Sequence, residues 1–135
     1  MGGWSPEEIA LARENLQRRR EAEYRAREER RQRALQALRE AASRVFPRFA
    51  TVQRAYLFGS VIYPGQMGLA SDVDVAVEGN LSPEDYFALW RALEEASGET
   101  IDLVELNEDV PFARRVRESG EVIYERRNPG SESGD

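Results

Sequence analysis

Residues 56–77, YLFGSVIYPGQMGLASDVDVAV, contain two aspartates, Asp72 and Asp74, one residue apart in a run that otherwise has the pattern of a buried strand. Side chains two positions apart on a strand point to the same side, with Cα atoms about 6–7 Å apart. Both carboxylates therefore share one face of the predicted strand, and Val73 and Val75 line the other. Burying unpaired anions is costly. The pattern favours a divalent cation, and carboxylate oxygens suit Mg²⁺.

A third carboxylate and a Gly-Ser pair accompany these aspartates. Asp102 lies in TIDLVEL, residues 100–106, a second apolar run that predicts a strand. If the two strands are neighbours, the three carboxylates can meet; alternatively, each aspartate lies on a wet sheet face and binds nothing. Gly59 permits close backbone approach, and Ser60 offers a hydroxyl and an amide at a predicted strand-to-helix turn, where a phosphate could rest.

Short apolar runs alternate with helical patterns after Pro47. Strands are predicted at residues 54–58, 72–77, 100–106 and 121–125, with a helix starting at Ser82 and Pro83 and another over residues 110–118. This order predicts an α/β (α+β) fold with a small mixed β-sheet of about four strands covered by helices. The tail, residues 128–135, has the composition of disorder.

A long N-terminal helix precedes this pattern. Ser5 and Glu8 form a capping-box signature, and no Gly or Pro interrupts the chain from Glu7 to about Arg44. We divide the chain into a charged helical arm (residues 1–40), a domain (41–127) and the tail. Residues expected to pack on the domain recur at helical spacing: Leu35, Leu38, Ala42, Val45 and Phe46.

The middle of the arm is different. Residues 17–33 carry few apolar side chains, so we expect this segment to bury no face of its own. A solvated helix, a helix that docks a partner or self-associates, and an RNA-binding element are all open interpretations. The arginines are interleaved with glutamates, which is a weak pattern for nucleic-acid binding.

Composition excludes several chemistries. The 135 residues contain no Cys or His, and all 19 basic residues are Arg, so Ser-His pairs, thiolate chemistry and a P-loop lysine are excluded. Residues 1–50 carry 12 Arg against 8 Glu, net +4, whereas residues 51–135 carry 7 Arg against 17 acidic residues, net −10. An acidic domain repels polyanions, which disfavours nucleic acid as a partner. No apolar run predicts a bilayer span or a secretory signal, so we expect no membrane association and a cytoplasmic location.

Four motifs together resemble the polymerase β-like nucleotidyltransferase superfamily. They are FGS (58–60), SDVDVAV (71–77), IDLVEL (101–106) and ESGEVIYE (118–125). More narrowly, the set is similar to the minimal nucleotidyltransferases, or MNT proteins, over roughly residues 40–127. The resemblance implies the nucleotidyltransferase fold and catalytic use of ATP with Mg²⁺, in two ions.

The resemblance also implies roles for particular residues. Gly59 and Ser60 would bind the nucleotide triphosphate, and Asp72 and Asp74 would ligate metal. Asp102 would ligate the catalytic metal and help to deprotonate the attacking hydroxyl. The three aspartates are thus the expected catalytic and metal-binding residues.

One feature departs from the family pattern. The family commonly has an Arg soon after Gly-Ser, but here VIYPG follows, and no basic residue occurs between Arg54 and Arg91. The charge of a triphosphate would then have to be met by metal, by backbone amides, or by an arginine from elsewhere, such as Arg54, Arg91 or a partner chain.

The resemblance finally implies a biological setting. MNT proteins commonly act as antitoxins to HEPN-family toxin ribonucleases, and some transfer AMP to a tyrosine of that partner. We therefore expect Mg²⁺-dependent transfer of AMP from ATP to a hydroxyl of such a protein partner. The alternatives are a non-catalytic binding module that neutralises a partner by contact, and a transferase for a small molecule such as an aminoglycoside or for RNA.

Overall fold

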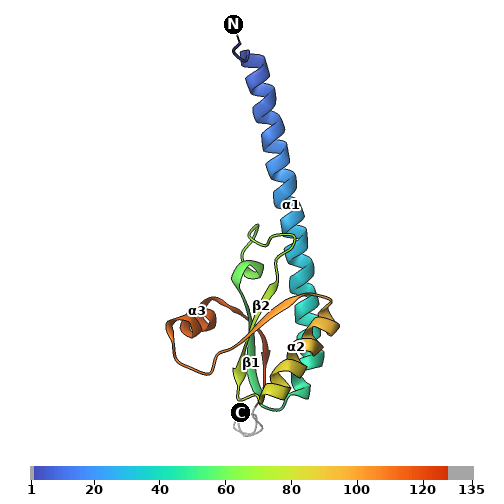
Figure 1. The fold of residues 1–135 in the computed structure, drawn as a ribbon, viewed down its shortest axis with the longest axis vertical. Helices are drawn as coiled ribbons and strands as arrows, with labels where there is room; N and C mark the ends of the chain where they lie inside the picture. The colour runs from blue at the N-terminus through green and yellow to red at the C-terminus, as the bar shows by residue number, and fades with distance from the viewer. Residues whose placement is uncertain (1, 128–135) are drawn as a thin grey trace.

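Four strands form one mixed sheet in the computed structural model, which describes residues 2–127 (Figure 1). The strands are β1 (Val52–Phe58), β2 (Val73–Gly79), β3 (Ile101–Glu105) and β4 (Glu121–Glu125), in the spatial order β3-β2-β1-β4. β1 is antiparallel to β2 and β4, whereas β2 and β3 are parallel. The predicted mixed sheet of four strands is confirmed. The predicted tail lies outside the described residues.

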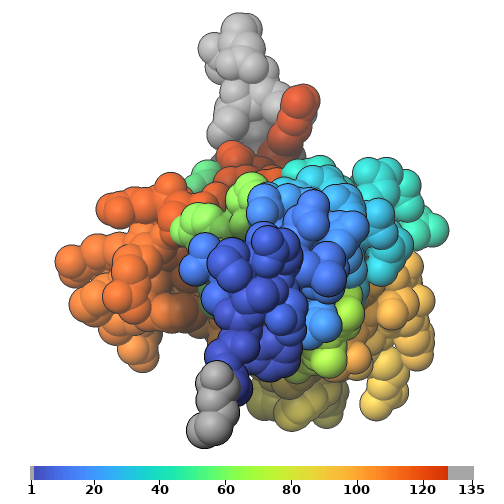
Figure 2. Space-filling view, turned by 90° about the horizontal axis from the view of Figure 1, so that it is seen from above, coloured from blue at the N-terminus to red at the C-terminus, as the bar shows by residue number. Residues whose placement is uncertain are grey.

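The two faces of the sheet are covered differently. On one face, α1 (Pro6–Val45) and α2 (Pro83–Ser97) pack over a core that includes Val73, Val75 and Val77. On the other face, the shorter α3 (Pro111–Ser119) packs on Tyr56 and Ala76. α2 and α3 lie on opposite sides of the molecule, as Figure 2 shows in yellow and orange. The acidic positions of β2 and β3 belong to the less covered face.

Local signals in the sequence explain the helix ends. Ser5 and Glu8 form the predicted capping box at the start of α1. The Ser82 side chain accepts a hydrogen bond from the Asp85 amide at the start of α2. Gly98 ends α2 in a left-handed conformation at φ 71°. The parallel pairing of β2 and β3 depends on α2, because parallel strands need a crossover connection.

Only the C-terminal half of helix α1 packs against the sheet and α2, which we call the body. The 40 residues of α1 span about 60 Å at 1.5 Å per residue. Residues 6–25 are exposed throughout and project beyond the body (Figure 1). The side chains predicted to pack on the domain are all buried: Leu35, Leu38, Ala42, Val45 and Phe46. The projecting segment (residues 6–25) extends from the end of the body where β1 ends and β2 begins.

One sequence expectation about α1 is wrong. We expected residues 17–33 to bury no face, yet Arg31 is only 8% exposed, and Arg27, Glu28 and Arg30 are half-buried. These polar side chains contact the connecting loop between β1 and β2 (residues 59–72), largely through its backbone. Apolar periodicity does not report contacts of this kind.

Across the part of the chain that the structure describes, no helix combines the length and apolar character that a bilayer span requires.

Candidate active site

Asp74 and Asp102 are register partners on the parallel strands β2 and β3. Neighbouring strands lie about 4.8 Å apart, and register partners point to the same face. Val73 and Ile101, one position before each aspartate, are 0% and 2% exposed in the core, so the two carboxylates occupy the opposite face. The fold therefore brings together two acids that lie 28 positions apart in the sequence.

Asp72 lies one residue before β2 rather than within the strand as predicted, and it is exposed. It still acts on Asp74. The pKa of Asp74 is raised above its ordinary value, first because burial disfavours the charged carboxylate, then because Asp102 and Asp72 repel it. We call these three residues the carboxylate cluster. Its members repel one another, and a bound cation would relieve that repulsion.

Gly59 places the connecting loop directly against this cluster. A Cβ atom at Gly59 would lie 2.2 Å from Asp74 Oδ2, and the backbone has φ +75°, which favours glycine. Phe58, the preceding residue, is the register partner of Asp74 on β1. A phosphate held by this turn would therefore lie beside the carboxylates.

The local structure around Ser60 differs from the expectation. Ser60 lies in η2 (Gly59–Ile62), a 3-10 turn of four residues, and not at the start of an α-helix. Pro64 and Gly65, the latter at φ +74°, turn the chain before a helix can extend. An α-helix macrodipole is thus missing at this turn, and a phosphate would depend on local amides, the Ser60 hydroxyl and metal.

The two arginines expected to meet a triphosphate lie elsewhere. Arg54 is four residues before Phe58, about 13 Å along the strand, and it forms an ion pair with Glu125 at 3.2 Å. Arg91 is exposed on α2, which covers the opposite face of the sheet. Neither side chain is positioned beside the carboxylate cluster.

An aromatic pair borders the cluster. The rings of Phe58 and Phe112 meet edge to face with centroids 5.6 Å apart, and Phe112, on α3, is 40% exposed. Because Phe58 is the register partner of Asp74, this pair lies on the same face as the carboxylates. We did not predict Phe112 from the sequence, where it has the pattern of an ordinary helix residue.

The donor set fits a metal ion that is shared with a ligand. Mg²⁺ typically takes one or two protein carboxylates and completes its octahedron with water and phosphate oxygens. Asp74 and Asp102 supply hard oxygen donors from adjacent strands, with Asp72 nearby. Within residues 2–127, no group of three or more acidic side chains is arranged so that it could hold a metal ion by itself. Phosphate oxygens would have to complete the shell.

A mixed sheet with two carboxylates on adjacent strands, next to a Gly-Ser turn, is the arrangement expected of a nucleotidyltransferase domain. The chain matches the family described as polymerase beta nucleotidyltransferase over residues 40–129, and it belongs to this family. The predicted enzyme class is confirmed.

Three solved structures are similar to the chain. A crystal structure of the toxin-antitoxin MntA-HepT is 22% identical, covering 72% of this chain and 71% of that one at a TM-score of 0.43. A toxin-antitoxin structure with AMP-PNP is 24% identical, covering 76% and 77% at 0.48. A tri-AMPylated Shewanella oneidensis HEPN toxin in complex with MNT antitoxin is 20% identical, covering 78% and 75% at 0.43. A comparison with curated proteins found no match.

Proposed function

We propose that this nucleotidyltransferase uses Mg²⁺ and ATP and transfers AMP to a hydroxyl of a protein partner. The observation that carries the proposal is the register pairing of Asp74 with Asp102 on one sheet face, against the backbone of Gly59. Adjacent carboxylates that repel each other favour a bound cation, and a close glycine turn leaves room for phosphate. Transfer of a nucleotidyl group requires both.

Each residue has a role in that reaction. Asp72 and Asp74 would hold metal, and the connecting loop at Gly59 and Ser60 would orient the triphosphate. Asp102 would also hold metal and would help to deprotonate the attacking hydroxyl. That oxygen forms a bond to the α-phosphorus as the bond to the β-phosphate oxygen breaks, and pyrophosphate leaves. When bound, Mg²⁺ supplies charge stabilisation for the attacking and leaving oxygens.

The proposed acceptor is a HEPN-family toxin, with this chain as its antitoxin. Support for the acceptor comes from the motifs shared with MNT proteins and from the negative charge of the chain after the arm. Residues 51–135 have a net charge of −10, which disfavours an RNA acceptor. The projecting segment leaves the body at the end where β2 begins, and α1 itself covers the sheet face opposite the carboxylate cluster.

A second candidate function is a binding module that neutralises its partner without chemistry. It is favoured by one observation: neither Arg54 nor Arg91 lies beside the cluster, so the charge of a triphosphate has no arginine partner in either of them. Such a module would keep its effect on the partner when the carboxylates are replaced.

The test uses ATP labelled at the α-phosphate, Mg²⁺ and a HEPN-family toxin. We expect label on the toxin with the wild type, and a loss of at least about 10³-fold with Asp74→Asn and Asp102→Asn. Glu105→Gln is the matched control, because it removes an exposed carboxylate from the same strand at a position of opposite parity. Neutralisation of the toxin by the wild type without label transfer would overturn the enzymatic proposal and support the binding module.

A further inference from the structure

One arginine of α1 joins the segments that lead into β2 and β3. Arg30 donates from Nε to the Leu69 carbonyl at 3.3 Å and from an Nη atom to the Ser71 carbonyl at 3.4 Å. The same guanidinium forms an ion pair with Glu99 at 2.6 Å. The Arg30 and Glu99 side chains are only 16% and 14% exposed, so water screens this pair weakly.

These contacts lie immediately before the carboxylates. Ser71 precedes Asp72, and Glu99 precedes Asp102 by three positions. The first backbone hydrogen bond between the two segments runs from the Val73 amide to the Thr100 carbonyl, at 2.9 Å. Arg30 therefore joins the chain on both sides of the point where the two acidic strands begin to pair.

The strand ends need such a connection. Asp74 and Asp102 are register partners on adjacent strands, so their like charges repel each other. Without a cation, this repulsion favours separation of β2 from β3 at the end that carries the acids. Arg30 opposes that separation through backbone contacts and a salt bridge, without neutralising a carboxylate of the cluster.

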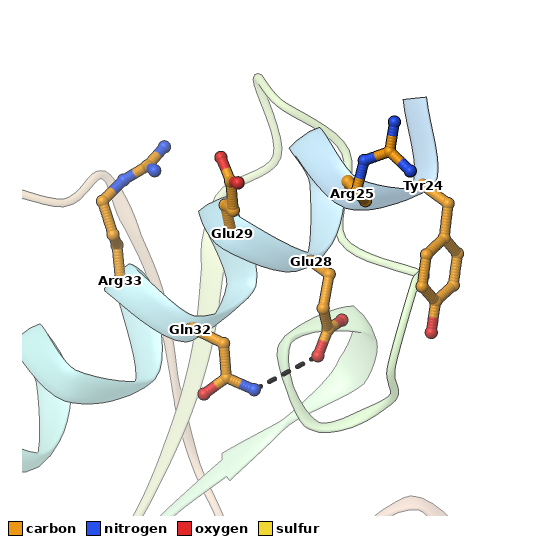
Figure 3. A pocket seen from close by; sticks show the side chains of 6 residues that line it. All are labelled: Tyr24, Arg25, Glu28, Glu29, Gln32 and Arg33. Carbon is orange, nitrogen blue, oxygen red and sulfur yellow. Dashed lines mark hydrogen bonds between the residues drawn. The ribbon is translucent and has the colours of Figure 1, made fainter. Parts of the chain in front are cut away.

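Neighbouring side chains of α1 hold a different part of the connecting loop. Glu28 accepts a hydrogen bond from the Gly65 amide at 2.9 Å, Arg31 donates to the Val61 carbonyl at 3.2 Å, and Arg27 donates to the Gly65 carbonyl at 3.1 Å. Figure 3 shows Glu28 turned towards the loop. Glu28 also lines an open hollow of about 430 Å³ on α1. None of the cluster's carboxylates lines this hollow. Arg30 alone among these four contacts a residue that leads into β3.

We propose that Arg30 is a positioning residue of the active site, which holds β2 and β3 at the spacing that lets Asp74 and Asp102 bind one metal ion. The metal-binding part of this inference rests on the proposed function, whereas the contact between the strand ends does not. Helix α1 would thus contribute a residue to the active site, which the amino-acid sequence of the helix did not predict.

The effect of removing Arg30 on metal affinity distinguishes a role of its charge from a role in positioning. If Arg30 acted only through its positive charge, its removal would strengthen the binding of a cation nearby. If Arg30 positions the carboxylates, its removal weakens cation binding, because the ligands lose their spacing. Metal affinity therefore moves in opposite directions under the two explanations.

The experiment compares Arg30→Met with Arg39→Met in the full chain. Arg39 also lies on α1 and forms an ion pair with a strand residue, Glu121 of β4, at 2.6 Å, and β1 separates β4 from the two acidic strands. Hydrogen exchange of the Val73 amide is measured without metal, and the free Mn²⁺ signal in electron paramagnetic resonance gives Mn²⁺ affinity. Both are measured well below the melting temperature.

We expect Arg30→Met to speed exchange of the Val73 amide about tenfold and to weaken Mn²⁺ binding about tenfold, with Arg39→Met changing neither. Arg30→Lys should restore part of both losses by keeping the ion pair with Glu99. Glu99→Gln should act in the same direction as Arg30→Met, and the double variant should be no worse than Arg30→Met, because the two residues act as one unit.

Unchanged or tighter Mn²⁺ binding in Arg30→Met, or equal losses in Arg39→Met, would overturn the inference. If the wild type binds no Mn²⁺ and labels no toxin, the proposed function fails. The exchange rate of the Val73 amide then still decides whether Arg30 holds the strand ends together.

Discussion

Asp74 and Asp102 face each other across the parallel pair of strands β2 and β3, and Gly59 contacts the first of them from the end of β1. Three strands thus contribute to one small region of the sheet. The arrangement places like charges next to each other on the less covered face. The adjacent carboxylates favour the binding of a cation, but they lower the stability of the metal-free protein. The first predictions below depend on this opposition.

Replacing Asp74 with Asn should stabilise the metal-free protein. The pKa of Asp74 is raised in the folded state, so the folded chain binds the proton more tightly than the unfolded chain does, and stability falls as pH rises above the ordinary carboxyl pKa. At pH 7 in a chelator, we expect a melting temperature higher by roughly 1–4 °C, as for a change of up to about 1 kcal/mol.

The same variant should lose its response to metal. Mg²⁺ or Mn²⁺ should raise the melting temperature of the wild type, because a ligand of the folded state stabilises it. Asp74→Asn should show little of this rise. If Asp74→Asn melted below the wild type in the chelator, repulsion at Asp74 would not be what destabilises the metal-free protein.

Gly59→Ala should damage both stability and function. The left-handed backbone costs a residue with a Cβ about 1–2 kcal/mol, and here the new atom would also lie 2.2 Å from Asp74 Oδ2. Gly98→Ala is the matched control, since Gly98 has φ +71° with nothing within 4 Å of the added atom. Both variants should melt lower in a thermal scan.

Only Gly59→Ala should lose Mn²⁺ affinity and label transfer. Equal losses of Mn²⁺ affinity in the two variants would show that backbone strain, and not the approach of Gly59 to Asp74, is responsible.

Glu28 should make the stability depend on acid pH. Hydrogen bonds from Arg31 and from the Gly65 amide lower the pKa of Glu28 from 4.5 to about 2. A lowered carboxyl pKa contributes stability that is fully present above the unfolded value and is lost as pH falls through the folded value. The difference in melting temperature between the wild type and Glu28→Gln should be full at pH 7 and should shrink from about pH 4.5 downwards.

Glu29→Gln provides the control, because Glu29 lies next to Glu28 on the same helix and is exposed. Its melting temperature should follow that of the wild type at every pH. A constant difference between the wild type and Glu28→Gln across this range would contradict the pairing with Arg31.

Deletion of residues 2–20 should leave the body intact. These residues bury no apolar core with the rest of the chain, and the side chains of α1 that hydrogen-bond to the connecting loop lie outside the deleted segment: Arg27, Glu28, Arg30 and Arg31. We expect the melting temperature to change by less than about 2 °C and Mn²⁺ affinity to stay unchanged. Label transfer to the toxin should fall if the projecting segment docks the partner. A large loss of stability would show that the segment has a structural role.

The amino-acid sequence determined the elements and the chemistry. Alternating Val and Asp at residues 72–77 fixed which face of β2 is apolar, because strand side chains alternate, and the capping residues fixed where α1 and α2 begin. The absence of His, Cys and Lys left carboxylates as the reactive groups. The shared motifs indicated the family that the match over residues 40–129 confirmed.

Only the tertiary structure decided which groups meet. Register between β2 and β3 is set by a crossover helix and long-range packing, so the sequence allowed Asp74 and Asp102 to meet without requiring it. The 3-10 turn at Ser60 and the contacts of Arg30 and Arg31 with backbone carbonyls were likewise hidden. A backbone carbonyl is present at every residue, so sequence patterns carry no signal for the arginine that will bind it; only the path of the folded chain provides one.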